Sequence, residues 1–282
     1  MNSSRPSNSN LSLRSVMGRG LRRSLSALPA DVRDHLFRIT SQYASVGEIH
    51  RSCLQSIEGA LELVKENGFR PRAIVDIGAY VGNWSRMARQ VFPGVPVVMI
   101  DGNPENDEAL RAAAQSIGSE AKHYVALLGP ETREEVTLLQ SGTGTSMLRE
   151  LTTFGARPIQ VSMHTLDGLL KPEGLSSPLL LKLDVQGFEL EVLRGGMDTL
   201  RKAEVVVLEV STLPYNENAP LFADVVGFMA NAGFAVYDFC GQARRVADHA
   251  LFQMDMVFAH HDSPLRRQRK FLADEPEKQL RR

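Results

Sequence analysis

The segment from Asp76 to Trp84 carries the clearest chemical pattern in the sequence, Asp-Ile-Gly-Ala-Tyr-Val-Gly-Asn-Trp. An apolar run over 73–77 leads into it, so the glycines fall on a turn between a buried strand and a helix. Such a turn brings bare backbone and helix N-terminal N–H groups to the carboxyl edge of a sheet, where open α/β folds bind nucleotides. The pattern indicates a ligand-binding turn; a plain strand–helix turn is the alternative.

The glycine spacing discriminates between nucleotide ligands. A dinucleotide fingerprint needs Gly-x-Gly-x-x-Gly, whereas this turn reads Asp-x-Gly-x-x-x-Gly. An acid at Asp76 suits an ammonium group better than a diphosphate, which points to the methionine part of S-adenosylmethionine. Asp101 ends the next apolar run about 20 residues beyond the glycines, where an acid hydrogen-bonds ribose hydroxyls. The predicted cofactor-binding residues are Asp76, Gly78, Ala79, Gly82, Asn83, Asp101 and Ala126.

A third constellation lies on the apolar run over 178–184. The two-residue period of a strand puts Lys182 and Asp184 on the same side. An ionised pair on a buried strand is unfavourable unless it is paired or used, which makes Asp184 a candidate site residue. The alternatives are a structural Lys–Asp pair and an acid that caps the helix after Gly187.

Alternating strands and helices must position these acids. The alternation predicts an α/β layered fold with a mostly parallel sheet. The stretch 129–175 is less regular and is expected to add strands and loops beside the site. Strands are expected over 73–77, 95–101, 121–127, 178–184, 203–210, 235–239 and 251–259, and helices over 82–92, 105–117, 187–200 and 219–231.

Four parts are expected along the chain: a disordered tail over 1–30, a helical cover over 31–70, one α/β domain over 71–262 and a charged tail over 263–282. The first part is rich in arginine and serine and has no acid, so it cannot bury enough apolar surface to fold alone. A transit peptide and a segment that binds an anionic surface are the alternatives.

The overall composition excludes several classes of protein. With 32 Lys+Arg against 33 Asp+Glu, the formal net charge is −1, which argues against a dedicated nucleic-acid binder. No apolar stretch approaches the ~20 residues of a transmembrane helix. The two cysteines cannot build a disulfide framework, and they fit a reducing cytoplasm. A cytoplasmic protein is therefore predicted, and its oligomeric state stays open.

Together these motifs resemble the FkbM family of S-adenosylmethionine-dependent methyltransferases. The resemblance covers about residues 71–260, and Leu-Lys-Leu-Asp-Val-Gln-Gly-Phe-Glu at 181–189 is its most specific part. One departure is Asp101-Gly102-Asn103-Pro104, where the family often has Glu-Pro. The resemblance implies a Rossmann-like class I methyltransferase fold, with seven strands, an antiparallel last strand and helices on both faces. It also implies O-methylation of a sugar, glycolipid or polyketide-type hydroxyl.

Methyl transfer to a hydroxyl needs groups that orient the hydroxyl and accept its proton. Asp184 is the first choice for this role. Glu209 ends the next strand and would share the role or help to hold a divalent cation. His164 has a suitable intrinsic pKa and is the third catalytic candidate. No dense cluster with metal-ligand spacing appears, so no metal is predicted.

Two other functions stay open at this point: a dinucleotide-dependent oxidoreductase, and a non-catalytic methyltransferase-like module that acts as a scaffold. Methylation of a nucleic-acid base is disfavoured, because the strand ending at Asp184 lacks the Asn/Asp-Pro-Pro-Tyr/Phe pattern. Ribose 2′-O-methylation is harder to dismiss, since Lys182, Asp184 and Glu209 suit it. The weakly charged chain favours a small-molecule or carbohydrate acceptor.

Overall fold

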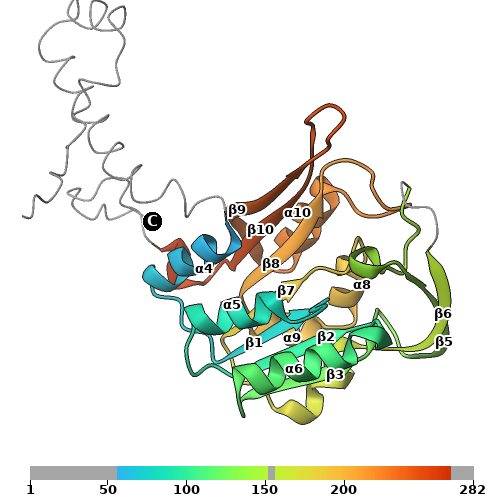
Figure 1. Ribbon diagram of the computed structural model, residues 1–282. Coiled ribbons are helices and arrows are strands. Elements are labelled where there is room, and N and C mark those ends of the chain that lie inside the picture. The colour runs from blue at the N-terminus through green and yellow to red at the C-terminus, as the bar shows by residue number, and fades with distance from the viewer. Residues whose placement is uncertain (1–55, 152–155, 268–282) are drawn as a thin grey trace, which may run out of the picture. The chain divides into compact units, whose positions relative to one another are not determined.

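The computed structural model describes residues 56–151 and 156–267 (Figure 1). The tail over 1–30 and most of the helical segment over 31–70 lie outside these residues. The helices are α4 (Ile57–Glu66), α5 (Asn83–Val91), α6 (Asp107–Ile117), α7 (Leu166–Leu170), α8 (Glu189–Arg194), α9 (Met197–Lys202) and α10 (Phe222–Asn231). The strands are β1 (Ala73–Ile77), β2 (Val97–Asp101), β3 (Ala121–Val125), β4 (Leu127–Leu128), β5 (Arg133–Gln140), β6 (Arg157–His164), β7 (Leu179–Leu183), β8 (Ala203–Ser211), β9 (Phe234–Arg244) and β10 (Leu251–His260).

Seven strands form the main sheet in the order β3-β2-β1-β7-β8-β10-β9. Neighbouring strands are parallel, except that β10 runs antiparallel to both β8 and β9. This confirms the mostly parallel sheet with an antiparallel last strand. The chain adds β2 and β3 on one side of β1 and then returns to place β7 on the other. Ligands of open α/β sheets bind at the carboxyl ends of strands where the order reverses in this way.

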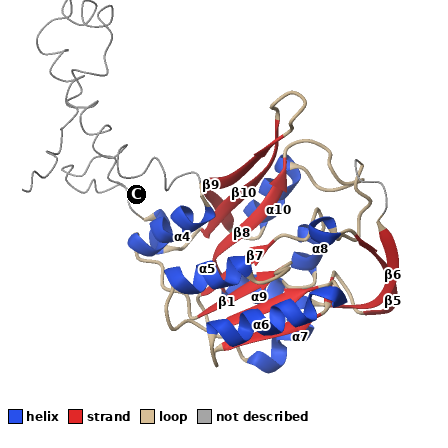
Figure 2. Ribbon diagram, in the orientation of Figure 1, coloured by secondary structure: helices blue, strands red, loops and turns tan. Residues whose placement is uncertain are grey.

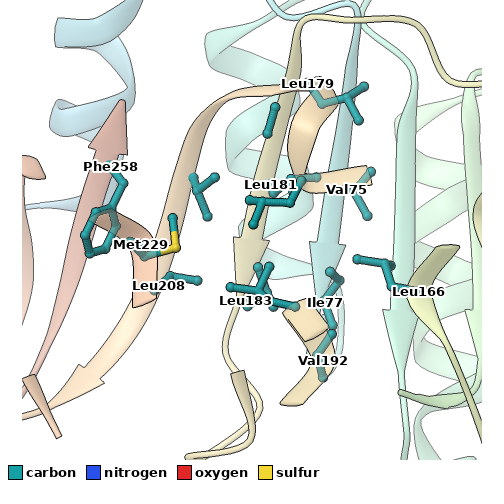
Figure 3. Packing of buried hydrophobic residues seen from close by; sticks show 14 of the residues in the cluster. Val75, Ile77, Leu166, Leu179, Leu181, Leu183, Val192, Leu208, Met229 and Phe258 are labelled. Atoms are coloured by element: carbon teal, nitrogen blue, oxygen red, sulfur yellow. The ribbon is translucent and has the colours of Figure 1, made fainter. Parts of the chain in front are cut away.

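Helices cover both faces of the main sheet (Figure 2). On one face, α4, α5 and α6 bury residues such as Leu61, Ala88 and Leu110. On the other, α7 to α10 pack against inward-facing strand residues. Figure 3 shows that packing, with Val75 and Ile77 of β1 beside Leu181 and Leu183 of β7. Because β1 and β7 are buried on both faces, they read as apolar runs, interrupted only by Asp76 and Lys182.

Most predicted elements match the structure closely, but three differ. Strand β9 continues to Arg244, five residues beyond the predicted 235–239, and the predicted strand 121–127 is divided between β3 and β4 of different sheets. The sequence predicts one helix over 187–200, but α8 and α9 are separated at Gly195 and Gly196. A Cβ atom at Gly195 would lie 2.1 Å from the backbone oxygen of Gly129, and one at Gly196 would lie 2.6 Å from Leu166 Cδ2. This close approach requires glycine, and the two glycines end α8 there.

The irregular stretch over 129–175 does supply added strands. With β4, strands β5 and β6 form a separate three-stranded sheet in the order β4-β6-β5. Its buried residues Leu127, Val136, Leu138 and Met163 make a small core of their own. In the chain, this sheet begins directly after β3. Figure 1 shows β5 and β6 beside the main sheet.

Both flanking segments contribute to the core where the structure describes them. Helix α4 buries Ala60, Leu61 and Val64 in the same core as α5 and α6. Leu265, within the expected charged tail, is also buried there. Within 56–151 and 156–267, no helix combines the length and apolar composition needed to cross a bilayer.

Candidate functional site

The turn after β1 is packed too closely for any side chain at its first glycine. Gly78 has a φ of +76°, and a Cβ atom there would lie 1.8 Å from the backbone oxygen of Asp184. Gly82, with a φ of +75°, is the N-cap of α5, and its Cβ would lie 2.5 Å from Ala113 Cβ. The spacing of these glycines therefore follows from two close approaches, one to the β7 turn and one to α6.

The N–H groups of this turn are used within the protein. Gly78 N and Ala79 N both donate to the oxygen of Ile100, at 2.9 and 3.1 Å. Tyr80 N donates to Asp101 Oδ2 at 2.8 Å. A diphosphate held on a glycine turn needs such N–H groups as donors. These three N–H groups are therefore not available to a phosphate without breaking bonds to β2.

The carboxylate of Asp101, at the carboxyl end of β2, accepts three hydrogen bonds. Its Oδ1 accepts from Asn103 N and from Asn106 Nδ2, both at 2.9 Å, while Oδ2 accepts from Tyr80 N. The carboxylate is thereby held rigidly, and Oδ2 makes one hydrogen bond although a carboxylate oxygen accepts two. That remaining capacity suits a ligand hydroxyl. Sequence reasoning missed Asn106 and the backbone of Tyr80.

Asp76 is fully buried, and the charged side chains of Lys182 and Asp184 lie next to it in turn. Its Oδ2 accepts from Ser85 Oγ at 2.7 Å, and Lys182 Nζ lies 3.8 Å from its Oδ1. The same Nζ lies 3.0 Å from Asp184 Oδ2. Burial raises the pKa of Asp76, although Lys182 opposes that shift. Lys182 therefore joins two carboxyl groups from neighbouring strands.

Burial alone would lower the pKa of Lys182, but Asp184 and Asp76 outweigh burial and raise it. The ammonium is therefore charged. The Lys182 side chain is 6% exposed, whereas that of Asp184 is 31% exposed. Asp184 is thus the member of the ion pair that a ligand can reach.

Asp184 and Glu209 form a carboxyl pair at the ends of β7 and β8. Gln186 Nε2 donates to Asp184 Oδ1 at 2.8 Å and to Glu209 Oε2 at 3.0 Å. Gln253 Nε2, from β10, donates to the same Glu209 oxygen at 3.0 Å. The Gln186 amide therefore connects the pair, whereas the Gln253 amide holds Glu209 alone, and neither glutamine was among the predicted site residues. Gln186 lies in the Asp-Val-Gln-Gly motif, whereas no sequence signal marks Gln253.

The two carboxyl groups have opposite pKa shifts. Burial acts to raise the pKa of Asp184, but the charge of Lys182 and hydrogen bonds from Lys182, Gln186 and Glu209 outweigh it and lower the pKa. For Glu209, burial and then the negative charges of Asp184 and Glu189 raise the pKa well above its usual range. Folding therefore favours the ionised form of Asp184 and the protonated form of Glu209.

Two further buried acids, Glu189 and Asp255, lie near the pair of Asp184 and Glu209. Glu189 Oε1 accepts from Val185 N and Gly187 N, at 2.9 and 3.1 Å, and so fixes the turn after β7. Burial raises the pKa of Glu189 to about 7, with the backbone hydrogen bonds opposing it. Burial, followed by the charge of Asp184, raises the pKa of Asp255 on β10 to about 7.

These raised pKa values predict a pH-dependent stability. Asp255 holds a proton in the folded state that the unfolded chain loses near pH 4, so the free energy of unfolding falls as the pH rises from about 4 to about 7. Each such group contributes at most about 1.4 kcal/mol per pH unit. Asp255→Asn should make this fall shallower, measured by urea unfolding at about pH 5 and about pH 7.5.

The exposed Asp262 provides the control, since its side chain is 91% exposed. Asp262→Asn should leave the slope unchanged. An Asp255→Asn variant with the wild-type slope would show that folding does not raise the pKa of Asp255.

A cavity of about 590 Å³ is lined both by predicted cofactor-binding residues and by predicted catalytic residues. On one side its lining includes Gly78, Asp101 and Ala126, and on the other it includes Asp184 and Glu209. The volume lies within the range of small-molecule sites. The cavity lies where the strand order reverses, at the carboxyl ends of β2, β1, β7 and β8.

The remaining predicted residues do not line this cavity: Asp76, Ala79, Gly82, Asn83 and His164. Asn83 begins α5, and its Oδ1 accepts from Arg86 at 2.8 Å. His164 ends β6 in the second sheet, and its Nε2 lies 3.2 Å from Ser162 Oγ. The structure therefore does not bring His164 to the carboxyl pair.

Among the described residues, no group of three or more His, Cys, Asp or Glu side chains has a geometry that could hold a metal ion.

The sheet order, its one antiparallel strand and the glycine turn beside acids at the strand ends define a class I methyltransferase fold. Residues 76–236, more than half of the 282-residue chain, match the family model of the methyltransferase FkbM domain. The chain belongs to this family. No curated protein matches it.

Several solved structures are similar to the chain. The FkbM methyltransferase from Methylobacillus flagellatus KT is 15% identical, with a TM-score of 0.43, over 66% of this chain and 43% of that chain. This chain thus spans less than half the length of that protein. Magnesium protoporphyrin IX methyltransferase from Synechocystis PCC 6803, solved with bound S-adenosylmethionine, is 12% identical, with a TM-score of 0.42, over 86% of this chain and 92% of that chain.

Proposed function

We propose that the chain is an S-adenosylmethionine-dependent O-methyltransferase that acts on a hydroxyl of a saccharide, glycolipid or polyketide-type small molecule. The observation that carries the proposal is the cavity, which is lined both by the glycine turn with Asp101 and by the carboxyl pair Asp184 and Glu209. A methyl donor and a hydroxyl acceptor must meet in one enclosed space, because transfer requires the reacting atoms to be in line and in contact.

The donor half of the cavity suits a nucleoside without a diphosphate. Asp101 Oδ2 retains a lone pair for a ribose hydroxyl, and Tyr80 lines the cavity beside it. The turn's N–H groups at Gly78, Ala79 and Tyr80 already have acceptors. This arrangement favours S-adenosylmethionine over the nicotinamide dinucleotides that an oxidoreductase would bind. When bound, S-adenosylmethionine supplies an activated methyl group.

In the acceptor half, Asp184 would orient the hydroxyl and take its proton. Its lowered pKa keeps it ionised, and so an acceptor, at neutral pH, whereas the raised pKa of Glu209 favours its protonated form. A low pKa does not disqualify Asp184, because the hydroxyl proton becomes strongly acidic only as the oxygen gains the methyl group. A weak but correctly placed carboxylate is then sufficient.

The charge of the cavity favours an acceptor without phosphate groups. Four acids line it, Asp101, Glu150, Asp184 and Glu209, and no lysine, arginine or histidine is among the described residues of the lining. A phosphate would therefore find no cationic partner among these lining residues. This supports a neutral sugar or similar hydroxyl compound over a nucleic acid.

Thermal unfolding with S-adenosylhomocysteine tests the donor half. At about one hundred times its dissociation constant, a ligand stabilises the folded state by about 2.7 kcal/mol, so the midpoint should rise by several degrees. Asp101→Asn should remove most of this shift, because it replaces the carboxylate that would bind the ribose with a weaker acceptor. Asparagine is preferred to alanine because three donors face the Asp101 carboxylate.

The control variant is Asp107→Asn, which changes an acid on the outside of α6 that pairs with Arg111. It should bind as wild type does. A shift with NAD⁺ in place of S-adenosylhomocysteine would support the oxidoreductase and overturn the proposal. Binding of S-adenosylhomocysteine without methylation of any acceptor in a screen of neutral sugars and glycolipids would favour the scaffold.

A further inference from the structure

Gln186 has a backbone conformation that its own residue type does not favour. Its φ is +56°, in the left-handed region that non-glycine residues seldom adopt. Its carbonyl oxygen accepts two hydrogen bonds, from Ser146 Oγ at 2.9 Å and from Asn216 Nδ2 at 2.6 Å. Ser146 and Asn216 are themselves buried, and they come from two different connections. The surrounding structure therefore determines this strained position.

The connections that hold Gln186 are also tied to each other. Leu151 N donates to the oxygen of Tyr215 at 2.9 Å, and Glu217 N donates to the oxygen of Arg149 at 2.8 Å. The segment 146–151 and the segment 215–217 thus pair along their backbones. Both contribute residues to the cavity lining. The position of Gln186 depends on this paired segment as well as on β7.

The carboxamide of Gln186 fixes the arrangement of the carboxyl pair. One amide nitrogen has two hydrogens, and here one faces Asp184 Oδ1 and the other faces Glu209 Oε2. The opposite orientation of the amide would put its oxygen against two carboxyl oxygens. Because an N–H only donates, both of these carboxyl oxygens must act as acceptors.

The proton of the pair then has one position. Both oxygens of Asp184 face donors, since Oδ2 faces Lys182 Nζ. Glu209 Oε2 faces two amide donors, from Gln186 and Gln253. A proton shared by the pair would therefore lie on Glu209 Oε1, which leaves both oxygens of Asp184 as acceptors.

We propose that Gln186 is a positioning residue for methyl transfer, because its carboxamide holds Asp184 and Glu209 in a single orientation, and Ser146 and Asn216 hold Gln186 in place. The inference rests on the proposed function, in which Asp184 takes the hydroxyl proton. Without the carboxamide, each carboxyl group loses a donor that favours its ionised form. The other charged groups near the pair are Lys182 on β7, Glu189 on α8 and Asp255 on β10.

Carboxyl ¹³C NMR titration of the full chain tests this inference. Resonances of the pair are assigned by their absence in Asp184→Asn and Glu209→Gln. In Gln186→Met, which keeps the length of the side chain but has no donor, the titration midpoint of Asp184 should rise by about one pH unit. Asn216→Ala should move it in the same direction by a smaller amount, since the carboxamide remains but is less firmly held. Asn231→Ala, at the exposed end of α10, should leave it unchanged.

S-adenosylhomocysteine binding is measured on the same samples. An unchanged Asp184 midpoint in a Gln186→Met variant that still binds the ligand would overturn the inference. If Gln186→Met does not fold, Asn216→Ala decides by the same criterion. A wild-type chain that does not bind the ligand would contradict the proposed function, and the titration would still report whether Gln186 positions the pair.

Discussion

Replacing Asp184 with asparagine is expected to slow methyl transfer by about 10² to 10⁴-fold, the range for removal of a positioned proton acceptor. S-adenosylhomocysteine affinity should stay within a few-fold of wild type, because Asp184 lies on the acceptor side of the cavity. The rate is measured with an acceptor found in the screen of neutral sugars and glycolipids. Activity near wild type would remove Asp184 from the reaction.

A second effect of this substitution must be separated from catalysis. Asp184 is the nearer partner of buried Lys182, at 3.0 Å, and Asp76 is 3.8 Å away. Loss of one partner of a buried ion pair costs up to about 3–5 kcal/mol, and Asp76 should reduce that cost here. The double variant Lys182→Met/Asp184→Asn removes the unpaired cation. It should recover stability without recovering activity, whereas recovery of both would make the role of Asp184 structural.

Replacing Gly78 with alanine is expected to have the largest effect on stability. The new Cβ would lie 1.8 Å from the Asp184 oxygen and 2.7 Å from its carbonyl carbon, so it meets backbone rather than a side chain that can rotate away. The left-handed φ adds a cost of about 1–2 kcal/mol. We expect the free energy of unfolding to fall by more than about 4 kcal/mol, or urea unfolding to show no cooperative transition.

Gly174→Ala is the matched control for this variant. Gly174 has a φ of +59°, and a Cβ atom there would have no neighbour within 4 Å. The free energy of unfolding of Gly174→Ala should fall only by the backbone cost of about 1–2 kcal/mol. Similar losses in both variants would mean that the β1 and β7 turns can separate, and that their close approach does not determine the spacing of the glycines.

The sequence predicted the strands that carry the site because buried parallel strands read as continuous apolar runs. Strand β1 is predicted at its observed bounds, and β2 and β7 end within a residue of theirs. It did not predict the break between α8 and α9. Helical periodicity continues across Gly195 and Gly196, and the contacts that require glycine there come from Gly129 and Leu166, far away in the chain.

What the sequence determined by itself was therefore the set of acids at strand ends. Asp101, Asp184 and Glu209 lie together because the carboxyl ends of parallel strands meet at one edge of a sheet. Only the tertiary structure decided which member of the pair has the lowered pKa and which the raised one. That choice depends on the burial of both carboxyl groups, on Lys182 beside one of them, and on the amides of Gln186 and Gln253. Burial and distance between strands are properties of the packed fold, and no spacing along the chain encodes them.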